Sequence, residues 1–150
     1  MKITTLKLLS VFLATAGVGA SAFAQSDLKL PDVSQAAEVK QRIALTDVTV
    51  NYHRPLVNGR KIWGALVPYG KVWRAGADEN TTIEVSDAVS VEGKPLPKGL
   101  YGLHMIPNQD SWTVIFSKTN TGWGSYSYDQ KEDALRVDVS KAINDSQSNR

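Results

Sequence analysis

The feature that most constrains the fold of this chain is the alternation of apolar and polar residues in short runs along its middle part. Successive side chains of a β-strand point to opposite faces, so a period of two predicts strands. Glycine, proline, asparagine and aspartate, which favour turns, separate the runs. The strands expected on this basis lie at 39–45, 48–52, 82–85, 89–91, 100–106, 112–117 and 135–139.

Turn sequences between the runs support the same fold class. Asn58-Gly59 predicts a type I′ hairpin turn, in which both central residues need a positive φ, and Glu92-Gly93 predicts another turn. Short strands with regular turns predict an all-β fold, a single antiparallel β-sandwich of the jelly-roll-like kind. The stretch 54–80 contains no clear strand. Irregular stretches of this length are uncommon in compact domains and often functional, so we expect one long irregular loop.

The first 24 residues predict a cleavable signal peptide. Lys2 and Lys7 are followed by the apolar run 8–18 and then by small residues ending Ala22-Phe23-Ala24. A basic start, an apolar core of about 7–15 residues and an A-x-A cleavage site define a secretory signal. The apolar run is well short of the roughly 20 residues that span a bilayer. We therefore expect cleavage after Ala24 and a periplasmic or secreted mature protein with no membrane span.

The expected organisation is a signal peptide at 1–24, an extended lead-in at 25–37, one β-sandwich domain at 38–143 and a polar tail at 144–150. Removal of two lysines from 17 Lys+Arg leaves 15 cationic residues against 15 Asp+Glu. A neutral domain offers no electrostatic surface for nucleic acid or anionic membrane. The chain has no cysteine, which excludes disulfides, thiolate catalysis and cysteine metal sites, so a packed core must provide its stability.

Candidate binding residues are concentrated in the irregular stretch. Two tryptophans there lie close to cations and carboxylates, a combination typical of small-molecule and sugar pockets. The first interpretation is a pocket with walls at Trp63 and Trp73 and polar anchors at Arg74 and Glu79. The second is structural: the tryptophans close one end of the sandwich, and Arg74 pairs with Glu79 or Asp78. The aromatic loop 123–129 is a further candidate border of the same pocket.

His104 is the main candidate for acid–base chemistry. It lies within an expected strand, where alternation places it on the same face as Gly102 and Ile106. Glu79 or Asp78 is the candidate carboxylate partner. Neither His104 nor His53 has a ligand partner two or four residues away, so no metal site is predicted. Walker, dinucleotide-binding and H-E-x-x-H motifs are missing, and we expect no cofactor.

Several runs resemble a known bacterial family of exported proteins, the domain of unknown function 2911. The resemblance extends from about Asp32 to Val139, and its most distinctive runs are Gly59–Gly64, Val67–Arg74, Gly76–Thr82, Gly93–His104 and Trp112–Phe116. It implies an exported single domain that is β-sandwich-like. It implies no catalytic role for any residue, because the family has no settled activity.

Three hypotheses about function follow from these observations. The first is a small-ligand-binding domain for a saccharide or peptide fragment, with Trp63, Trp73, Arg74, Glu79, Tyr101 and His104 as binding residues. The second is an envelope hydrolase or isomerase that uses His104 with Glu79 or Asp78. The third is an interaction module of an envelope assembly, which predicts an exposed apolar patch or an open sheet edge. The sequence does not determine the oligomeric state.

Overall fold

The computed structural model describes residues 32–140. The predicted signal peptide, the first part of the lead-in and the polar tail lie outside these residues. The strands within the described part are β1 (Gln35–Ile43), β2 (Thr46–Arg54), β3 (Thr82–Val85), β4 (Val89–Val91), β5 (Lys94–Leu96), β6 (Gly99–Pro107), β7 (Ser111–Ser117) and β8 (Asp133–Ser140). A single 3₁₀ turn, Gln130–Glu132, precedes β8.

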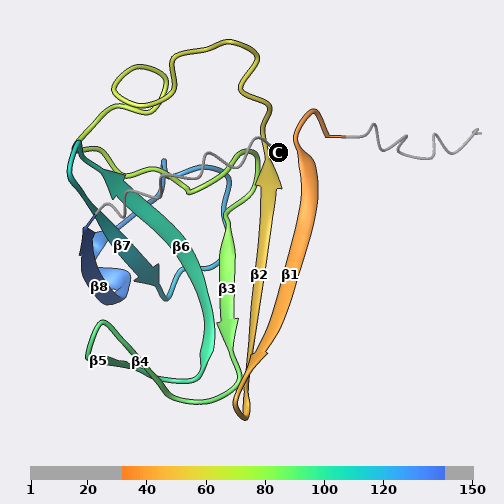
Figure 1. Ribbon diagram of the computed structural model, residues 1–150, viewed down its shortest axis with the longest axis vertical. Coiled ribbons are helices and arrows are strands. Elements are labelled where there is room, and N and C mark those ends of the chain that lie inside the picture. The colour runs from red at the N-terminus through yellow and green to blue at the C-terminus, as the bar shows by residue number, and fades with distance from the viewer. Residues whose placement is uncertain (1–31, 141–150) are drawn as a thin grey trace, which may run out of the picture. The chain divides into compact units, whose positions relative to one another are not determined.

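Six of the strands form one open sheet in the order β1-β2-β3-β6-β7-β8, with all neighbours antiparallel (Figure 1). The other two, β4 and β5, form a separate antiparallel hairpin. The predicted all-β antiparallel fold is confirmed. Its two sheets are unequal, because the second is only this hairpin. The strand pattern also extends further toward the N-terminus than expected, since β1 begins at Gln35.

Alternation along β6 gives the large sheet one apolar and one polar face. Leu103 pairs with Phe116 on β7, while His104 pairs with Ile115 and points to the opposite side. The β4–β5 hairpin covers the apolar face. The buried core on this side consists of Val85, Leu96, Tyr101, Leu103, Phe116 and Val137.

The segment 118–132 covers the other face of the sheet. Its two ends are joined because the Lys118 N–H donates to the Glu132 carbonyl at 2.8 Å. The segment crosses β6 at Gly102, where a Cβ atom would collide with the carbonyl oxygen of Thr119. Glycine is therefore needed at this position for the backbone to approach the strand so closely. The crossing brings the middle of the segment over His104.

The two predicted turns have different outcomes. Glu92 (φ 49°) and Gly93 (φ 74°) join β4 to β5, as expected of a two-residue hairpin turn. Asn58 (φ 49°) and Gly59 (φ 68°) are also left-handed, but no strands flank them. The hairpin predicted at Asn58-Gly59 is therefore wrong, and the turn belongs to the long irregular segment 55–81.

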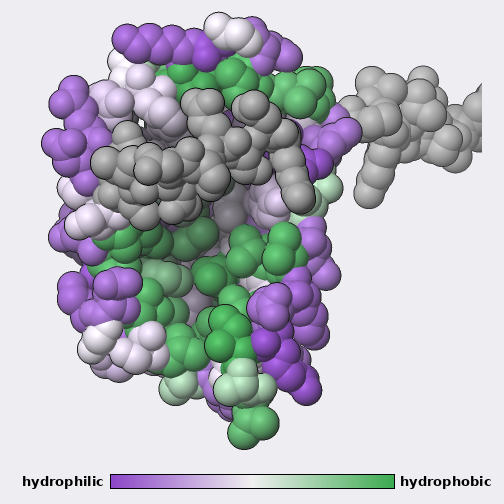
Figure 2. Space-filling view, in the orientation of Figure 1, coloured by the Kyte–Doolittle hydropathy of each residue, from purple (hydrophilic) through white to green (hydrophobic). Residues whose placement is uncertain are grey.

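β1 is an edge strand of the large sheet, and most of its side chains are exposed. Figure 2 shows apolar residues at the lower end of the view, where Figure 1 places the turn between β1 and β2. Leu45 in this turn is 91% exposed. Lys40 and Arg42 on the strand hold ion pairs with Asp47. Residues 32–140 contain no helix with the length and apolar character that a membrane crossing requires.

Packing of the hairpin against the sheet predicts a difference between two leucines. Leu96 of β5 is 1% exposed, whereas Leu100 of β6 is 43% exposed. We expect Leu96→Ala to lower the free energy of unfolding by about 2–5 kcal/mol, because it leaves a cavity in the core. Leu100→Ala is the matched control and should cost about 1 kcal/mol or less. Urea denaturation measures both, and equal losses would contradict the packing of the hairpin described above.

Candidate functional site

The long irregular segment is attached to the sheet along β6. β3 pairs only with residues 99–102 of β6, which leaves the second half of that edge free. Trp73 occupies it through two backbone hydrogen bonds with Met105, each 2.8 Å long. Further along, the Gly70 N–H donates to the Pro107 carbonyl at 3.0 Å. The segment thus extends the sheet beyond the end of β3.

This attachment places Arg74 and His104 on the same side of the sheet. Trp73 and Met105 form an isolated antiparallel bridge. Residues next to a bridge pair project to the face opposite that pair. Arg74 follows Trp73 and His104 precedes Met105, so both side chains leave toward the polar face.

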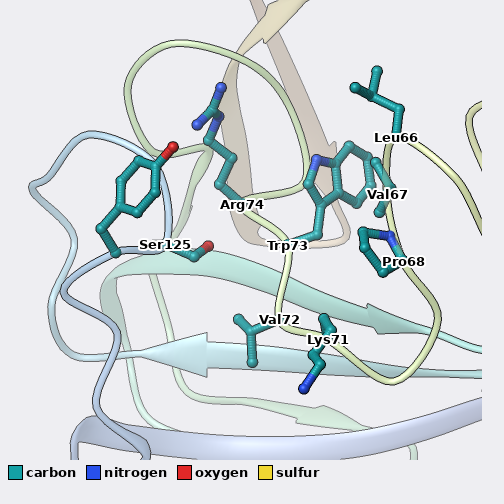
Figure 3. A pocket seen from close by; sticks show the side chains of 9 residues that line it. Leu66, Val67, Pro68, Lys71, Val72, Trp73, Arg74 and Ser125 are labelled. Atoms are coloured by element: carbon teal, nitrogen blue, oxygen red, sulfur yellow. The ribbon is translucent and has the colours of Figure 1, made fainter.

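A cavity of about 240 Å³ lies beside this attachment (Figure 3). Its lining is apolar on one side and polar on the other, and it comprises Leu66, Val67, Pro68, Lys71, Val72, Trp73, Arg74, Ser125 and Tyr126. In Figure 3 the side chains of Arg74 and Lys71 extend in opposite directions from their segment. The two cations therefore do not form a single charged clamp. Ser125 and Tyr126, both from the predicted border loop 123–129, line the cavity.

Arg74 is held by an aromatic contact. Its guanidinium carbon lies 5.2 Å from the centre of the Trp123 ring, within the range of a cation–π interaction. Trp123 in turn stacks on Tyr126 with ring centres 6.0 Å apart. Gly124 lies directly beside the guanidinium, because a Cβ there would come within 2.8 Å of Arg74 Nη1. Among residues 32–140, no carboxylate lies within 4.0 Å of the Arg74 guanidinium.

Three polar atoms of the Arg74 loop are buried without a hydrogen-bond partner in the described part of the chain: Arg74 Nε, Asp78 Oδ2 and Asn80 Oδ1. The same loop has left-handed backbone at Ala75 (φ 57°) and Asp78 (φ 54°), neither of which is glycine. Unpaired buried polar atoms and strained backbone both cost free energy, and both are concentrated at functional sites. The loop is therefore the strongest binding candidate in the described chain.

The Arg74 loop also pairs with the loop that carries Ser125. The Asn80 N–H donates to the Gly122 carbonyl at 3.1 Å, and the Gly124 N–H donates to the Asp78 carbonyl at 3.3 Å. Glu79 and Trp123 form an antiparallel bridge between these bonds. The two loops therefore form one unit beside the cavity.

His104 forms a side-chain hydrogen bond with Ser125. The Nδ1 atom of His104 lies 3.0 Å from Ser125 Oγ, and His104 is 3% exposed. Burial lowers the pKa of His104, and the negative charge of Asp133 offsets this effect only in part. His104 is consequently neutral at pH 7 and accepts a hydrogen bond at Nδ1 when its proton is on Nε2.

A polar network lies behind His104. The ring of Tyr128 is 5.2 Å from the imidazole, centre to centre. The Tyr128 hydroxyl donates to the Asp133 carboxylate, with distances of 2.9 and 2.8 Å to its two oxygens. Arg136 donates to Asp133 and to the Tyr128 hydroxyl. Asp133 is thus fixed in position as the carboxylate whose charge acts on His104.

The tryptophans predicted as pocket walls pack against one another. Trp63 contacts Trp73 and Trp112 edge to face, with ring centres 5.4 and 4.6 Å apart. Trp63 lines a second cavity with Trp112 and Tyr69 and does not line the first. Trp73 both packs in this cluster and lines the first cavity. Trp73 therefore packs against other tryptophans, as the structural interpretation expects, and also lines the first cavity. Trp63 packs in the same cluster and lines only the second of these two cavities.

The carboxylates predicted to act with His104 or Arg74 have other surroundings. Glu79 lies beside His53, with Glu79 Oε2 and His53 Nε2 3.5 Å apart. Asp78 has one carboxylate oxygen buried without a partner. Neither carboxylate forms an ion pair with Arg74 in the described residues, and the carboxylate that acts on His104 is Asp133. The predicted pairing of His104 with Glu79 or Asp78 is therefore not found. His104 instead has Ser125 as its hydrogen-bond partner and Asp133 as the carboxylate whose charge acts on it.

Tyr101, also predicted as a binding residue, is a core residue. It is 7% exposed, packs edge to face on Phe116 and donates its hydroxyl hydrogen bond to the Pro97 carbonyl at 2.7 Å. It is separated from His104 by three positions, so the two residues point to opposite faces of β6.

Sequence reasoning missed Ser125. Its partner His104 is distant in the sequence, and no short motif links them. The only local signal was the position of Ser125 within the aromatic, glycine-containing loop. Among the described residues no three His, Asp or Glu side chains are grouped as a metal site requires.

The fold and the cavity define a class: an all-β domain with an open antiparallel sheet and a small cavity lined by two loops. The chain belongs to the family described as protein of unknown function DUF2911, whose model matches residues 34–150. The resemblance inferred from the sequence is confirmed. Comparison with curated proteins and with solved structures found no match.

The lowered pKa of His104 predicts how stability depends on pH. The unfolded chain binds a proton at His104 below its ordinary pKa of 6.5, while the folded protein resists it. The free energy of unfolding should therefore decrease as the pH falls from 6.5 to the lower folded-state pKa. We expect this decrease to be smaller in His104→Gln, as measured by urea denaturation at several pH values. An NMR titration of the His104 ring with a midpoint at or above 6.5 would contradict the prediction.

Proposed function

We propose that this domain binds a small ligand with a negatively charged group in the cavity beside Arg74. The observation that carries the proposal is the Arg74 guanidinium, which has a buried Nε without a partner and no carboxylate nearby among residues 32–140. The Arg74 side chain is half-buried, and a partly desolvated cation without a counter-charge costs free energy. A carboxylate or phosphate on the ligand would supply the missing partner, with charge-assisted hydrogen bonds of about 1.5–3 kcal/mol each.

The position of Arg74 suits this role. Its contact with Trp123 orients the guanidinium plane without using its N–H groups. A planar group fixed in this way loses little conformational entropy when it binds a carboxylate. Gly124, with φ 74° and no side chain, leaves room beside it.

The rest of the cavity indicates the kind of ligand. Leu66, Val67, Pro68 and Trp73 give it an apolar wall, which suits a sugar ring or an aliphatic side chain. Its volume of about 240 Å³ is below the roughly 300–1,000 Å³ of sites for drug-sized ligands. The proposed ligand is accordingly an acidic monosaccharide or a peptide fragment of one or two residues.

The interaction-module hypothesis has less support. It draws on β1, a long edge strand with exposed Val39 and Ile43. Lys40 and Arg42 lie on the same strand, and charged residues on an edge disfavour pairing with another strand. We therefore rank ligand binding first.

Removal of the Arg74 charge should abolish the preference for anionic ligands. Two matched pairs of probes test this by calorimetric titration: D-glucuronate against D-glucose, and N-acetyl-alanyl-alanine against its C-terminal amide. We expect the charged member of one pair to bind at least about tenfold more tightly than its neutral counterpart. Arg74→Gln should remove that difference.

Lys98→Gln is the control for Arg74→Gln, because it removes one exposed cation from the turn before β6. It should bind like the unaltered protein. Equal binding of charged and neutral probes, binding of none of the four, or a preference that survives in Arg74→Gln would each overturn the proposal.

We also propose that the domain works outside the cytoplasm, after removal of residues 1–24. The basic start, apolar run and Ala22-Phe23-Ala24 of the sequence support this. Mass spectrometry of the protein from an envelope fraction should give a mature chain that begins at Gln25. Ala24→Tyr should retain the first 24 residues, because the cleavage site needs a small residue. Ser26→Tyr is the control, and processing of both variants alike would contradict the assignment.

A further inference from the structure

Ser125 has the surroundings of a nucleophile rather than of a simple loop residue. Its Oγ is 3.0 Å from His104 Nδ1, and Ser125 also lines the cavity. Figure 3 shows its hydroxyl directed toward the segment that carries Trp73 and Arg74. A hydroxyl that contacts both a base and a ligand cavity meets the geometric requirement for nucleophilic catalysis.

His104 has the properties of the matching base. It is neutral at pH 7, since burial opposes its protonation, so Nδ1 is free to accept the hydroxyl proton. The charged groups near it are Asp133, which acts directly on the imidazole, and Arg136, which is bound to Asp133. Tyr128 contacts the ring and donates to Asp133. The charge of Asp133 stabilises the imidazolium that forms when His104 takes a proton.

We propose that Ser125 and His104 are a nucleophile and base that hydrolyse a small carboxylic ester bound in this cavity. The inference adds a reaction to the proposed binding, and it stands on the serine–histidine geometry rather than on the preference of Arg74 for anions.

In the first half of the reaction, Ser125 Oγ forms a bond to the ester carbonyl carbon, and its proton moves to His104 Nδ1. The carbonyl electron pair moves to the oxygen, and the cation of Arg74, which lines the same cavity, stabilises the resulting negative charge. The carbon–oxygen bond to the alcohol then breaks, and Nδ1 returns the proton to the leaving oxygen. The products of this half are an acyl-serine and a free alcohol.

In the second half, water attacks the acyl carbon and gives a proton to His104 Nδ1. The bond between that carbon and Ser125 Oγ breaks, and Oγ recovers the proton. The net change is ester and water to acid and alcohol, so no further reactant is needed. Ser125 and His104 touch the reacting atoms, while Asp133 acts only through His104.

A structural role for the Ser125–His104 hydrogen bond makes a different prediction. In that case the bond only fastens the loop to the sheet, and Ser125 is no more reactive than any other serine. The two roles are separable because the chain contains no cysteine, so a single introduced thiol reports on its own environment.

The first experiment compares Ser125→Cys with Ser127→Cys by the pH dependence of iodoacetamide alkylation. A thiol paired with His104 forms a thiolate–imidazolium pair, which lowers its pKa below the ordinary value of about 8.5. We expect the alkylation midpoint of Ser125→Cys to be at least about one pH unit below that of Ser127→Cys, because residue 127 is exposed and, within the described part of the chain, it is Ser125 that forms the hydrogen bond with His104. Equal midpoints would overturn the proposal.

The second experiment treats the unaltered full-length protein with a fluorophosphonate, which phosphorylates activated serines. Peptide mass spectrometry should find one adduct per chain on Ser125, no adduct in Ser125→Ala and an unchanged adduct in Ser127→Ala. His104→Gln should slow labelling by about 100-fold or more. Labelling elsewhere, or none at Ser125, would overturn the proposal whether or not Arg74 binds anionic ligands. If His104→Gln fails to fold, the comparison of Ser125→Cys with Ser127→Cys still tests whether His104 activates residue 125.

Discussion

The candidate site depends on two backbone hydrogen bonds between Trp73 and Met105. β3 is too short to pair with the whole of β6, so the backbone of the second half of β6 is left without a neighbouring strand on that side. Trp73 fills the edge, and its register then fixes which side chains lie together. Because neighbours of a bridge pair point to the opposite face, Arg74 projects on the same side as His104. A shift of one residue would place Arg74 on the apolar face, so this register determines the composition of the site.

The two faces of the sheet contribute differently to the stability of the domain. The apolar face, covered by the β4–β5 hairpin, must stabilise the domain without the help of disulfides. The polar face carries features that oppose folding: left-handed Ala75 and Asp78, and the unpaired polar atoms of the same loop. Each strained residue costs on the order of 1–3 kcal/mol, against a total stability of about 5–15 kcal/mol for a typical domain. Such a loop persists because the core on the other face offsets its cost.

The sequence predicted seven of the eight strands of the described residues, because alternation is a local signal, but it predicted no run at β5. The runs at 82–85 and 89–91 have the bounds of β3 and β4, and the runs from 100 onward differ from the observed strands by at most two residues at each end. It also singled out the segment of Trp73 and Arg74, which lines the cavity, because this segment combines tryptophans with cations and carboxylates. The hairpin at Asn58-Gly59 failed because backbone conformation at a turn does not reveal whether strands flank it. The sequence could not identify Ser125 as a site residue, because its contact with His104 depends on how the segment 118–132 folds over β6 and not on the residues next to it in the chain.

The segment 118–132 links the proposed binding and the proposed reactivity in a single structural element. By crossing β6 at Gly102 it buries His104, and this burial keeps the imidazole neutral. The same segment supplies Ser125 as the partner of that imidazole and Trp123 as the support of Arg74. A larger side chain at Gly102 would lift the segment from the strand and expose His104, raise its pKa toward the ordinary value and separate it from Ser125. The charge state of the base, the position of the serine and the orientation of the arginine therefore all follow from one close backbone contact.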